Sequence, residues 1–169
     1  VAIGANAGQT DQGGPSVAIG WNSGNTTQGA YSVAIGHLSG NNNQKAYSVA
    51  IGDEAGHISQ GMGSVAIGST AGNQNQNDNA TAIGNRAGEF NQGPNAVAIG
   101  NFAGQGTEGG QGQYPNSIII NASGSALNSV DVSRFYVNPI RIVSSDSAPG
   151  LALYWDPSSS EIVAWNDTG

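Results

Sequence analysis

The chain has 169 residues, among them 27 glycines and no cysteine, with only 9% charged residues and a formal net charge of −7. The absence of cysteine excludes disulfides and thiol-ligated metals, and the negative charge makes nucleic acids and anionic membrane surfaces poor partners. No apolar run approaches the roughly 20 residues that a membrane span requires, so we expect no membrane insertion.

A 16-residue unit occurs in six tandem copies from Val1 to Ala96, and a seventh copy opens at Val97. A fixed period of this length indicates a stacked, quasi-one-dimensional fold. It also argues against the disorder that so polar a composition would otherwise indicate. The sequence therefore predicts an all-β protein, a parallel β-roll or β-helix with one coil for each copy.

Positions 1 to 4 of the unit, counted from its first residue, read Val-Ala-Ile-Gly in every copy except the sixth, which begins with Thr81. This stretch predicts a short strand whose first and third side chains point to one face and whose alanine points to the other. Glycine at positions 4 and 8 predicts backbone with positive φ, or corners that another backbone approaches closely.

Position 12 is glutamine in all six copies. Because the same amide returns at every step, we expect a structural ladder in which each side chain donates a hydrogen bond to one neighbouring coil and accepts one from the other. The ladder residues are Gln12, Gln28, Gln44, Gln60, Gln76 and Gln92.

The regular large apolar residues of each copy are one valine and one isoleucine. These are too few to offset the conformational entropy lost when 16 residues are ordered. Hydrogen bonds between coils narrow the difference, but they contribute only about 1 kcal/mol net each. A symmetric oligomer would bury the outward face of the strands and shield their edges, so we expect a homotrimeric fibre.

Positions 5, 6, 9, 10, 14 and 15 vary between copies, so recognition chemistry is expected there. Tyr31 and Tyr47 both occupy position 15, in consecutive coils, and should lie about 4.8 Å apart, one strand spacing. They either bind a ligand or pack at the subunit interface. The candidate ligand-binding residues, which could stack on sugar rings or anchor a protein receptor, are Trp21, Tyr31, Tyr47, Phe90 and Phe102.

The period breaks at Gln105–Ser117, a glycine-rich stretch that predicts a lengthened loop at the end of the stack. Ile118–Asn121 then stands where Val-Ala-Ile-Gly would be, and its three isoleucines predict a strand buried on both faces. We accordingly divide the chain into a repeat domain at 1–117 and a trimeric β stem at 118–169.

The stem contains two further predicted features. Arg134–Val137 predicts a strand. The alternating runs Leu151–Trp155 and Glu161–Trp165, joined by a turn at Asp156–Ser160, predict a C-terminal hairpin. An isolated two-stranded ribbon is marginal in water, so this hairpin too is expected to contact neighbouring chains.

Catalytic and metal-binding patterns are sparse. Asp53 and Glu54 are adjacent and should diverge at the end of a strand rather than form the carboxylate pair of a glycosidase. His37 and His57 occupy different repeat positions and should not share a face within one chain. One histidine from each of three chains could bind a metal on the axis, although a solvated histidine is favoured. We expect no cofactor, no metal and no enzymatic activity.

The recurring Ser-Val-Ala-Ile-Gly followed by Ala-Gly resembles the head repeats of trimeric autotransporter adhesins. That resemblance implies a left-handed parallel β-roll in each subunit of a trimer. The tail, with IIINASGSALNS, FYVNPIR and the LALYWDPSSSEIVAW hairpin, resembles the region before the endosialidase-type intramolecular chaperone of viral tail fibres and spikes. In that family the chaperone drives trimerisation and then cleaves itself off, so the resemblance implies a mature fibre or a segment ending at that border.

These observations favour a structural, adhesive fibre on a virion surface or otherwise extracellular, which presents variable loops in three copies to a host glycan or protein receptor. Two other classes stay open. One is the head of a bacterial trimeric adhesin, and the other is a polysaccharide-depolymerising tail spike, which would need clustered carboxylates between subunits. Also open is whether the three chains form separate rolls or an intertwined triple β-helix.

Overall fold

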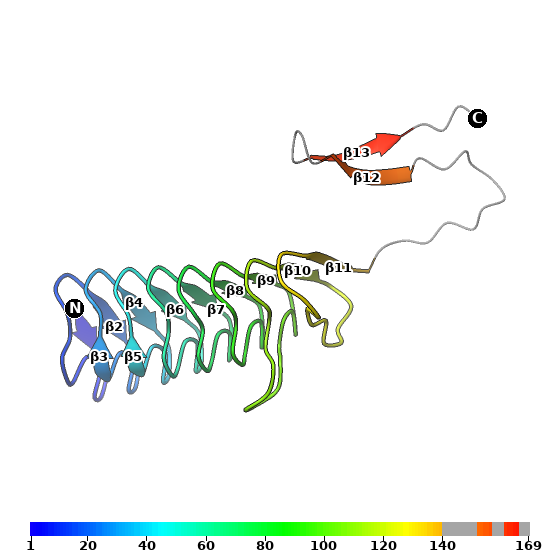
Figure 1. Ribbon diagram of the computed structural model, residues 1–169. Helices are drawn as coiled ribbons and strands as arrows, with labels where there is room; N and C mark the ends of the chain where they lie inside the picture. The colour runs from blue at the N-terminus through cyan, green and yellow to red at the C-terminus, as the bar shows by residue number, and fades with distance from the viewer. Residues whose placement is uncertain (140–151, 157–160, 166–169) are drawn as a thin grey trace. The chain divides into compact units, whose positions relative to one another are not determined.

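The computed structural model of the chain describes residues 1–139, 152–156 and 161–165. The chain divides into two compact units, Val1–Pro139 and Ile140–Gly169. The first unit is a stack of coils whose strands form a nine-stranded and a two-stranded parallel sheet (Figure 1). Every regular element among the described residues is a strand, which confirms the prediction of an all-β chain. The described part contains no helix of the length and hydropathy needed to span a membrane.

The main sheet has nine parallel strands, which follow one another in the order of the chain. Neighbouring coils pair in register, so that Val33 lies beside Val49 and Ile35 beside Ile51. Strands form at the Val-Ala-Ile segment of the copies, as predicted. The nine strands are β1 (Ala2–Ile3), β2 (Val17–Ile19), β4 (Val33–Ile35), β6 (Val49–Ile51), β7 (Val65–Ile67), β8 (Thr81–Ile83), β9 (Val97–Ile99), β10 (Ile118–Asn121) and β11 (Phe135–Asn138).

A second parallel layer is formed by positions 10 to 12. Its regular strands are β3 (Thr26–Gln28) and β5 (Asn42–Gln44), which pair with each other. Single bridges at position 10 continue the layer from Asn42 through Ile58 and Gln74 to Phe90. Figure 1 shows β3 and β5 beside the main sheet within the same coils. One chain therefore closes each coil by itself, which is the arrangement of a separate roll.

Small side chains fill the narrow interior of the roll. The alanines of position 2 are fully buried from Ala18 to Ala98, and positions 7 and 16 add buried alanine or serine. Apart from Ile119, the largest fully buried side chains include the position-12 glutamines. Because successive strand residues point to opposite faces, inward alanine places Val at position 1 and Ile at position 3 on the outside.

The glycines at positions 4 and 8 make the two corners that follow each main-sheet strand. Gly52, at position 4, has a φ of +131°, and a Cβ atom there would lie 2.6 Å from the carbonyl oxygen of Gly68. Gly56, at position 8, has a φ of +54°, and its Cβ would lie 2.7 Å from Oε1 of Gln60. Both predicted reasons for glycine, positive φ and a close backbone neighbour, are therefore confirmed.

The stack continues past the predicted domain boundary at residue 117. β10 pairs with β9 through Ile118 beside Val97, and β11 pairs with β10 through Phe135 beside Ile118. The compact unit ends instead at Pro139. The lengthened loop adds residues outside the coil, and the chain then returns to the next level of the same sheet.

Within one chain Ile118–Asn121 is buried on one face, and its predicted burial on the other face, which depends on neighbouring chains, stays a prediction. Ile119 is fully buried, but Ile118 and Ile120 remain 42% and 40% exposed. Ile119 takes the inward place that alanine has in the repeats, where it packs with Leu127 and Tyr136. Ile118 and Ile120 take the outward places of valine and isoleucine.

The second unit contains β12 (Ala152–Asp156) and β13 (Glu161–Trp165). They pair antiparallel, with Ala152 beside Trp165 and Asp156 beside Glu161. Most of the turn predicted between them lies outside the described residues, as does Leu151, with which the first run was predicted to begin.

Candidate functional site

An apolar face runs along the outer side of the main sheet. It consists of positions 1 and 3 of β1 to β9 and continues on β10 and β11 through Ile118, Ile120, Phe135 and Val137. These last four side chains are 36–50% exposed. We call this surface the Val/Ile face. A contiguous apolar surface of this kind marks an interaction site.

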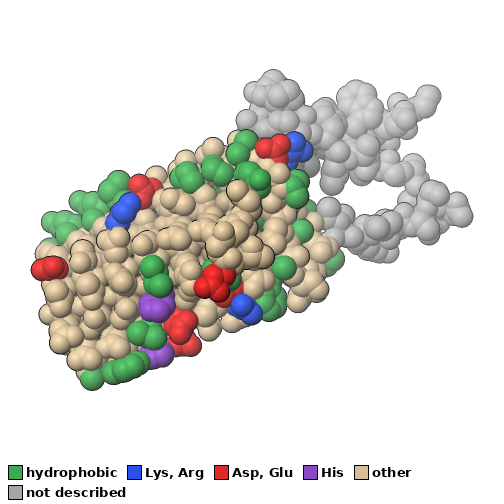
Figure 2. Space-filling view, turned by 60° about the horizontal axis from the view of Figure 1, so that its bottom comes forward, with side chains coloured by type: hydrophobic (Ala, Val, Ile, Leu, Met, Phe, Trp, Pro, Cys, Tyr) green, Lys and Arg blue, Asp and Glu red, His purple; other side chains and the backbone are tan. Residues whose placement is uncertain are grey.

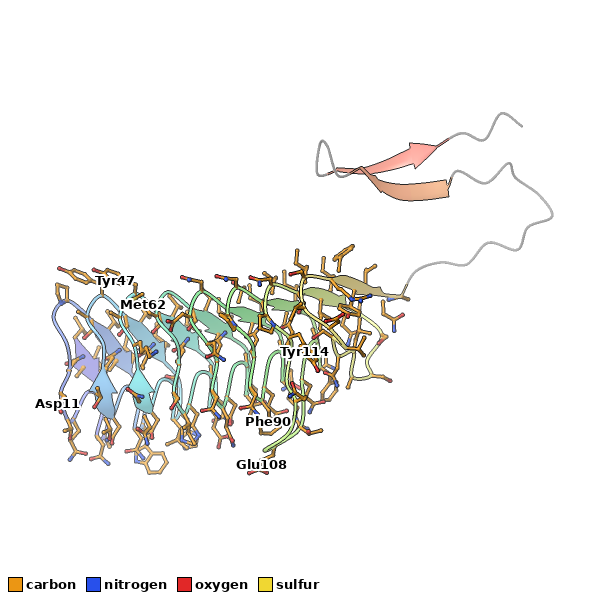
Figure 3. All side chains as sticks on the ribbon, in the orientation of Figure 1. Asp11, Tyr47, Met62, Phe90, Glu108 and Tyr114 are labelled. Atoms are coloured by element: carbon orange, nitrogen blue, oxygen red, sulfur yellow. The ribbon has the colours of Figure 1, made fainter. Side chains whose placement is uncertain are left out.

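The entry edge of the Val/Ile face is position 15, two residues before each strand of the main sheet. Tyr31 and Tyr47 stack there with ring centroids 5.3 Å apart and ring planes 4° apart. They are 58% and 61% exposed. Figure 3 shows Tyr47 and Met62 projecting from the same side of the roll. The two tyrosines lie next to each other near the strand spacing that the repeat predicts, as one exposed aromatic pair.

The exit edge of the Val/Ile face is position 5, directly after the glycine that ends each strand. Trp21 stacks on His37 with ring centroids 4.9 Å apart and planes 9° apart. Nδ1 of His37 lies 2.6 Å from Oδ1 of Asp53. Because Trp21 is 52% exposed, three consecutive coils present a row of side chains that order one another and remain open to a partner.

Phe90 and Phe102 are more enclosed than the other candidate ligand residues, since both are half-buried. The guanidinium of Arg86 lies 5.6 Å from the centre of the Phe102 ring. Its Nε donates to Oε2 of Glu89 at 2.7 Å, and Gln105 Nε2 donates to the same oxygen at 2.8 Å. The bond to buried Glu89 raises the pKa of Arg86. This network joins Arg86, Glu89 and Gln105 of neighbouring coils, and the sequence contains no signal for it, because a three-residue spacing predicts contact only on a helix.

The side chains of the position-12 glutamines mainly donate hydrogen bonds to the backbone carbonyl of position 1 in the same coil. Nε2 of Gln76 donates to the carbonyl of Val65 at 2.8 Å, and equivalent bonds recur from Gln28 onward. Hydrogen bonds between the side-chain amides of neighbouring coils join Gln12 to Gln28, Gln60 to Gln76 and Gln76 to Gln92. Within the described residues, Oε1 of Gln44 and of Gln60 accepts no hydrogen bond. The predicted ladder is thus interrupted at Gln44.

Gln113 is a ladder residue that sequence reasoning missed. Gln92 Nε2 donates to its Oε1 at 2.9 Å, and Gln113 in turn donates to the carbonyl of Val97 at 2.9 Å. The insertion in the seventh copy hides the repeat spacing. The signal that remains is the distance from Gln113 to Ser117, which equals the distance from Gln12 to Ser16 in the first copy.

The lengthened loop projects from the roll at the end opposite the entry edge. Glu108, near its tip, lies beyond the contour of the other coils in Figure 3. Its base is fixed to the previous coil, because the backbone N–H of Phe90 donates to the carbonyl of Gln105 and that of Gly93 to the carbonyl of Gln113. Closer to the tip, Asn91 Nδ2 donates to the carbonyl of Gly110 at 2.8 Å. The structure therefore presents one protruding polar loop on an otherwise regular surface.

The acidic and histidine candidates bind different partners. Asp53 is bonded to His37, whereas Oε2 of Glu54 accepts a hydrogen bond from Asn73 Nδ2 at 3.3 Å. The adjacent carboxylates thus diverge. Figure 2 shows the histidine side chains, in purple, on one broad side of the roll together with acidic side chains. Over the described residues, no three potential metal ligands of the types His, Cys, Asp and Glu form a group.

Residues 16–39 match the family described as the YadA head domain repeat, in two copies. The matched segment contains β2, β3 and β4, and thus both layers of the roll. No curated protein and no solved structure matches the chain. The sequence match and the β-solenoid together indicate an adhesin-like fibre.

Proposed function

We propose that this chain is a segment of a homotrimeric, non-enzymatic attachment fibre. The observation that carries the proposal is the Val/Ile face, which runs along the whole main sheet while the interior of the roll holds mainly small residues. The similarity of residues 16–39 to a YadA head repeat supports an adhesive role. The most regular large apolar side chains of the repeat therefore point toward a neighbouring subunit.

Three copies around an axis parallel to the stack would cover the Val/Ile face of each. A closed three-fold ring buries one face per subunit and leaves no unpaired partner surface. From β2 to β7 the register of the strands keeps valine beside valine and isoleucine beside isoleucine, and Thr81 takes the place of valine at β8. Most of the buried seam therefore repeats from coil to coil. The valine and isoleucine of most coils are already half-buried within one chain, so their complete burial adds less than the roughly 3–6 kcal/mol expected for two fully exposed side chains.

The second layer and the projecting loop then face outward and carry the ligand contacts. Position 10 runs through exposed and half-buried residues from Thr26 to Phe90, and the loop reaches out through Glu108. The ligand class is a surface glycan or a surface protein. Presentation in three copies lets weak contacts add up, because the second and third contacts form at high local concentration.

Two biological settings fit this role. The tail resemblance to the region before an endosialidase-type chaperone favours a virion surface, with attachment to a host cell. The YadA head similarity supports the head of a bacterial adhesin equally well. In both settings the segment is extracellular and works by adhesion.

The test compares binding by the trimer with binding by a variant that cannot form it. Ile51→Asp combined with Ile67→Asp puts charge into the Val/Ile face. Val130→Asp combined with Val132→Asp, two exposed positions between β10 and β11, is the matched control. On a glycan array and on whole cells we expect the double variant to bind at least about 100-fold more weakly than the wild type, and the control to remain trimeric. Equal binding by the double variant, or turnover of a polysaccharide by the wild type, would contradict the proposal.

A further inference from the structure

Each strand of the main sheet separates one entry-edge residue from one exit-edge residue. Tyr31 precedes β4 and His37 follows it, and Tyr47 and Asp53 flank β6 in the same way. The strand between them holds the two residues at opposite sides of the Val/Ile face and at nearly the same level of the stack. Figure 3 shows Tyr47 on one side of the roll and Phe90, in the second half of its coil, on the other.

A three-fold axis in front of the Val/Ile face brings unlike edges together. Rotation about an axis parallel to the stack places the entry edge of one subunit against the exit edge of the next, which is a heterologous contact. Because the axis is parallel to the stack, the rotation does not change the height of any coil along the stack, which we call its level. Each entry-edge residue therefore meets the exit-edge residue that flanks the same strand in the partner subunit.

We propose that these two edges form the corners of the trimer and pair level by level. This pairing rests on the proposed homotrimer and adds the contacts that fix its register. The pairs, each an entry-edge residue with an exit-edge residue of the partner subunit, are Pro15 with Trp21 of the partner subunit, Tyr31 with His37 of the partner subunit, Tyr47 with Asp53 of the partner subunit, Gly63 with Ser69 of the partner subunit, Asn79 with Asn85 of the partner subunit, and Asn95 with Asn101 of the partner subunit.

The chemistry of the two edges matches at each of these levels. At β2 and β4 a ring meets a ring, which favours stacking. At β6 the phenol of Tyr47 meets a carboxylate, which accepts its hydrogen bond. At β7 a glycine meets a serine, so two small residues share the level. At β8 and β9 an amide meets an amide, and each has both a donor and an acceptor.

The side chains at the bulky levels are already ordered before any contact forms. Tyr31 and Tyr47 stack on each other, and Trp21, His37 and Asp53 form one row. Ordered side chains lose less rotamer entropy when a partner binds. These residues therefore serve the corner between subunits, and the ligand surface is left to the second layer and the projecting loop.

The pairing also specifies how the three chains align along the axis. A slip by one level would set Tyr47 against Ser69 of the partner subunit and Gly63 against Asn85 of the partner subunit. It would thus separate the phenol from its carboxylate. The Val/Ile face gives little protection against such a slip, since valine and isoleucine recur in every copy of the repeat except at Thr81. The edges supply the specificity that the repetitive face lacks.

Cysteine cross-linking tests the pairing directly, because the chain has no cysteine of its own. The matched variant combines Asn79→Cys with Asn85→Cys, which flank β8 from opposite edges. The mismatched control combines Asn79→Cys with Ala122→Cys, which follows β10 and lies two levels or about 10 Å away along the stack. A disulfide needs Cα atoms about 4.4–6.8 Å apart, so only the matched variant should form one.

After mild oxidation we expect a covalent trimer of the matched variant on a non-reducing gel and uncross-linked chains of the control. Sedimentation of the reduced proteins should show a trimer in both cases. A trimer that fails to cross-link in the matched variant, or that cross-links equally in the control, would overturn the pairing while the trimeric fibre stands. Monomers in sedimentation would overturn the proposed fibre, and the pairing with it.

Discussion

At the scale of single residues, the position-4 glycines carry a backbone requirement that no other residue meets. We expect Gly52→Ala to destabilise the protein by more than about 2 kcal/mol, because the new Cβ would meet the Gly68 carbonyl at 2.6 Å in backbone with a φ of +131°. Gly14→Ala is the control, since its Cβ would lie 3.5 Å from that of Ala30. Urea denaturation at equal protein concentration measures both, and similar midpoints would contradict this reading of the corner.

The buried glutamines stabilise the roll by satisfying backbone groups. Gln76 donates to the carbonyls of Val65 and Ala80 and to Gln92 Oε1. Gln76→Leu leaves these acceptors without a donor in a buried place, and we expect a loss of about 2–4 kcal/mol in the free energy of unfolding. Gln111→Leu, in the exposed loop, should change it by less than about 0.5 kcal/mol. Equal effects would show that the ladder does not stabilise the roll.

Asp78 gives a pH dependence of known sign. The backbone N–H of Met62, at 2.8 Å, and Lys45 hold the pKa of Asp78 below its ordinary value of 3.8. The folded state therefore gains stability that is fully present above pH 3.8 and is lost as the pH falls through the lowered pKa. Because Asp78 is largely exposed, the gain is under about 1 kcal/mol.

The measurement is the difference in unfolding free energy between the wild type and Asp78→Asn. We expect the wild type to be more stable at pH 7 and the difference to vanish in acid. Lys45→Gln, which removes the weaker of the two contacts, should reduce the difference only in part. A difference that grows as the pH falls would have the wrong sign for this account.

The glycines and glutamines could be predicted from the repeat because each recurs at one position. The left-handed backbone at position 6 could not, since this position holds Leu38, Glu54 and Phe102 with φ of +52° to +57°. No local preference selects that conformation for these side chains. The pairing of neighbouring coils imposes the left-handed conformation, because the backbone N–H of Leu38 donates to the carbonyl of Trp21 and that of Glu54 to the carbonyl of His37.

At the scale of elements, β10 shows how one buried side chain anchors the end of the stack. Ile119 is fully buried against Leu127 and Tyr136. We expect Ile119→Ala to cost about 2–5 kcal/mol through lost burial and a residual cavity. Val132→Ala, at a 46% exposed position, should cost far less. Thermal unfolding of the two variants gives the comparison, and equal melting temperatures would contradict this role.

The strands of the repeat and β10 itself followed from the sequence, whereas the inward side chain of β10 and the continuation of the sheet past residue 117 did not. Three isoleucines in a row have the same apolar character at every place, so the sequence could not show that only Ile119 points inward. Successive side chains of a strand point to opposite faces, so the pairing of β10 with β9 places Ile119 beside inward-pointing Ala98 and turns Ile118 and Ile120 outward. The boundary at residue 117 failed for a related reason, because a loop insertion breaks the period without ending the sheet.

At the scale of the whole molecule, the account depends on what covers the Val/Ile face. Within one chain the interior holds alanine, serine and glutamine, while most of the valine and isoleucine of the repeats stays partly exposed. Such a chain gains little from the hydrophobic effect unless its outer face is also buried. Trp21, Tyr31 and Tyr47 were candidates from the sequence, but their place beside this face could not be predicted, since it depends on the corners of the coil.

Sedimentation equilibrium of the purified chain over a wide range of dilution tests this dependence most directly. We predict a single species with three times the 16.9 kDa mass of the chain, and we predict that dissociation at high dilution or in the Ile51→Asp, Ile67→Asp variant is accompanied by loss of β structure in circular dichroism. A stable, cooperatively folded monomer of 16.9 kDa in dilute solution would contradict the account.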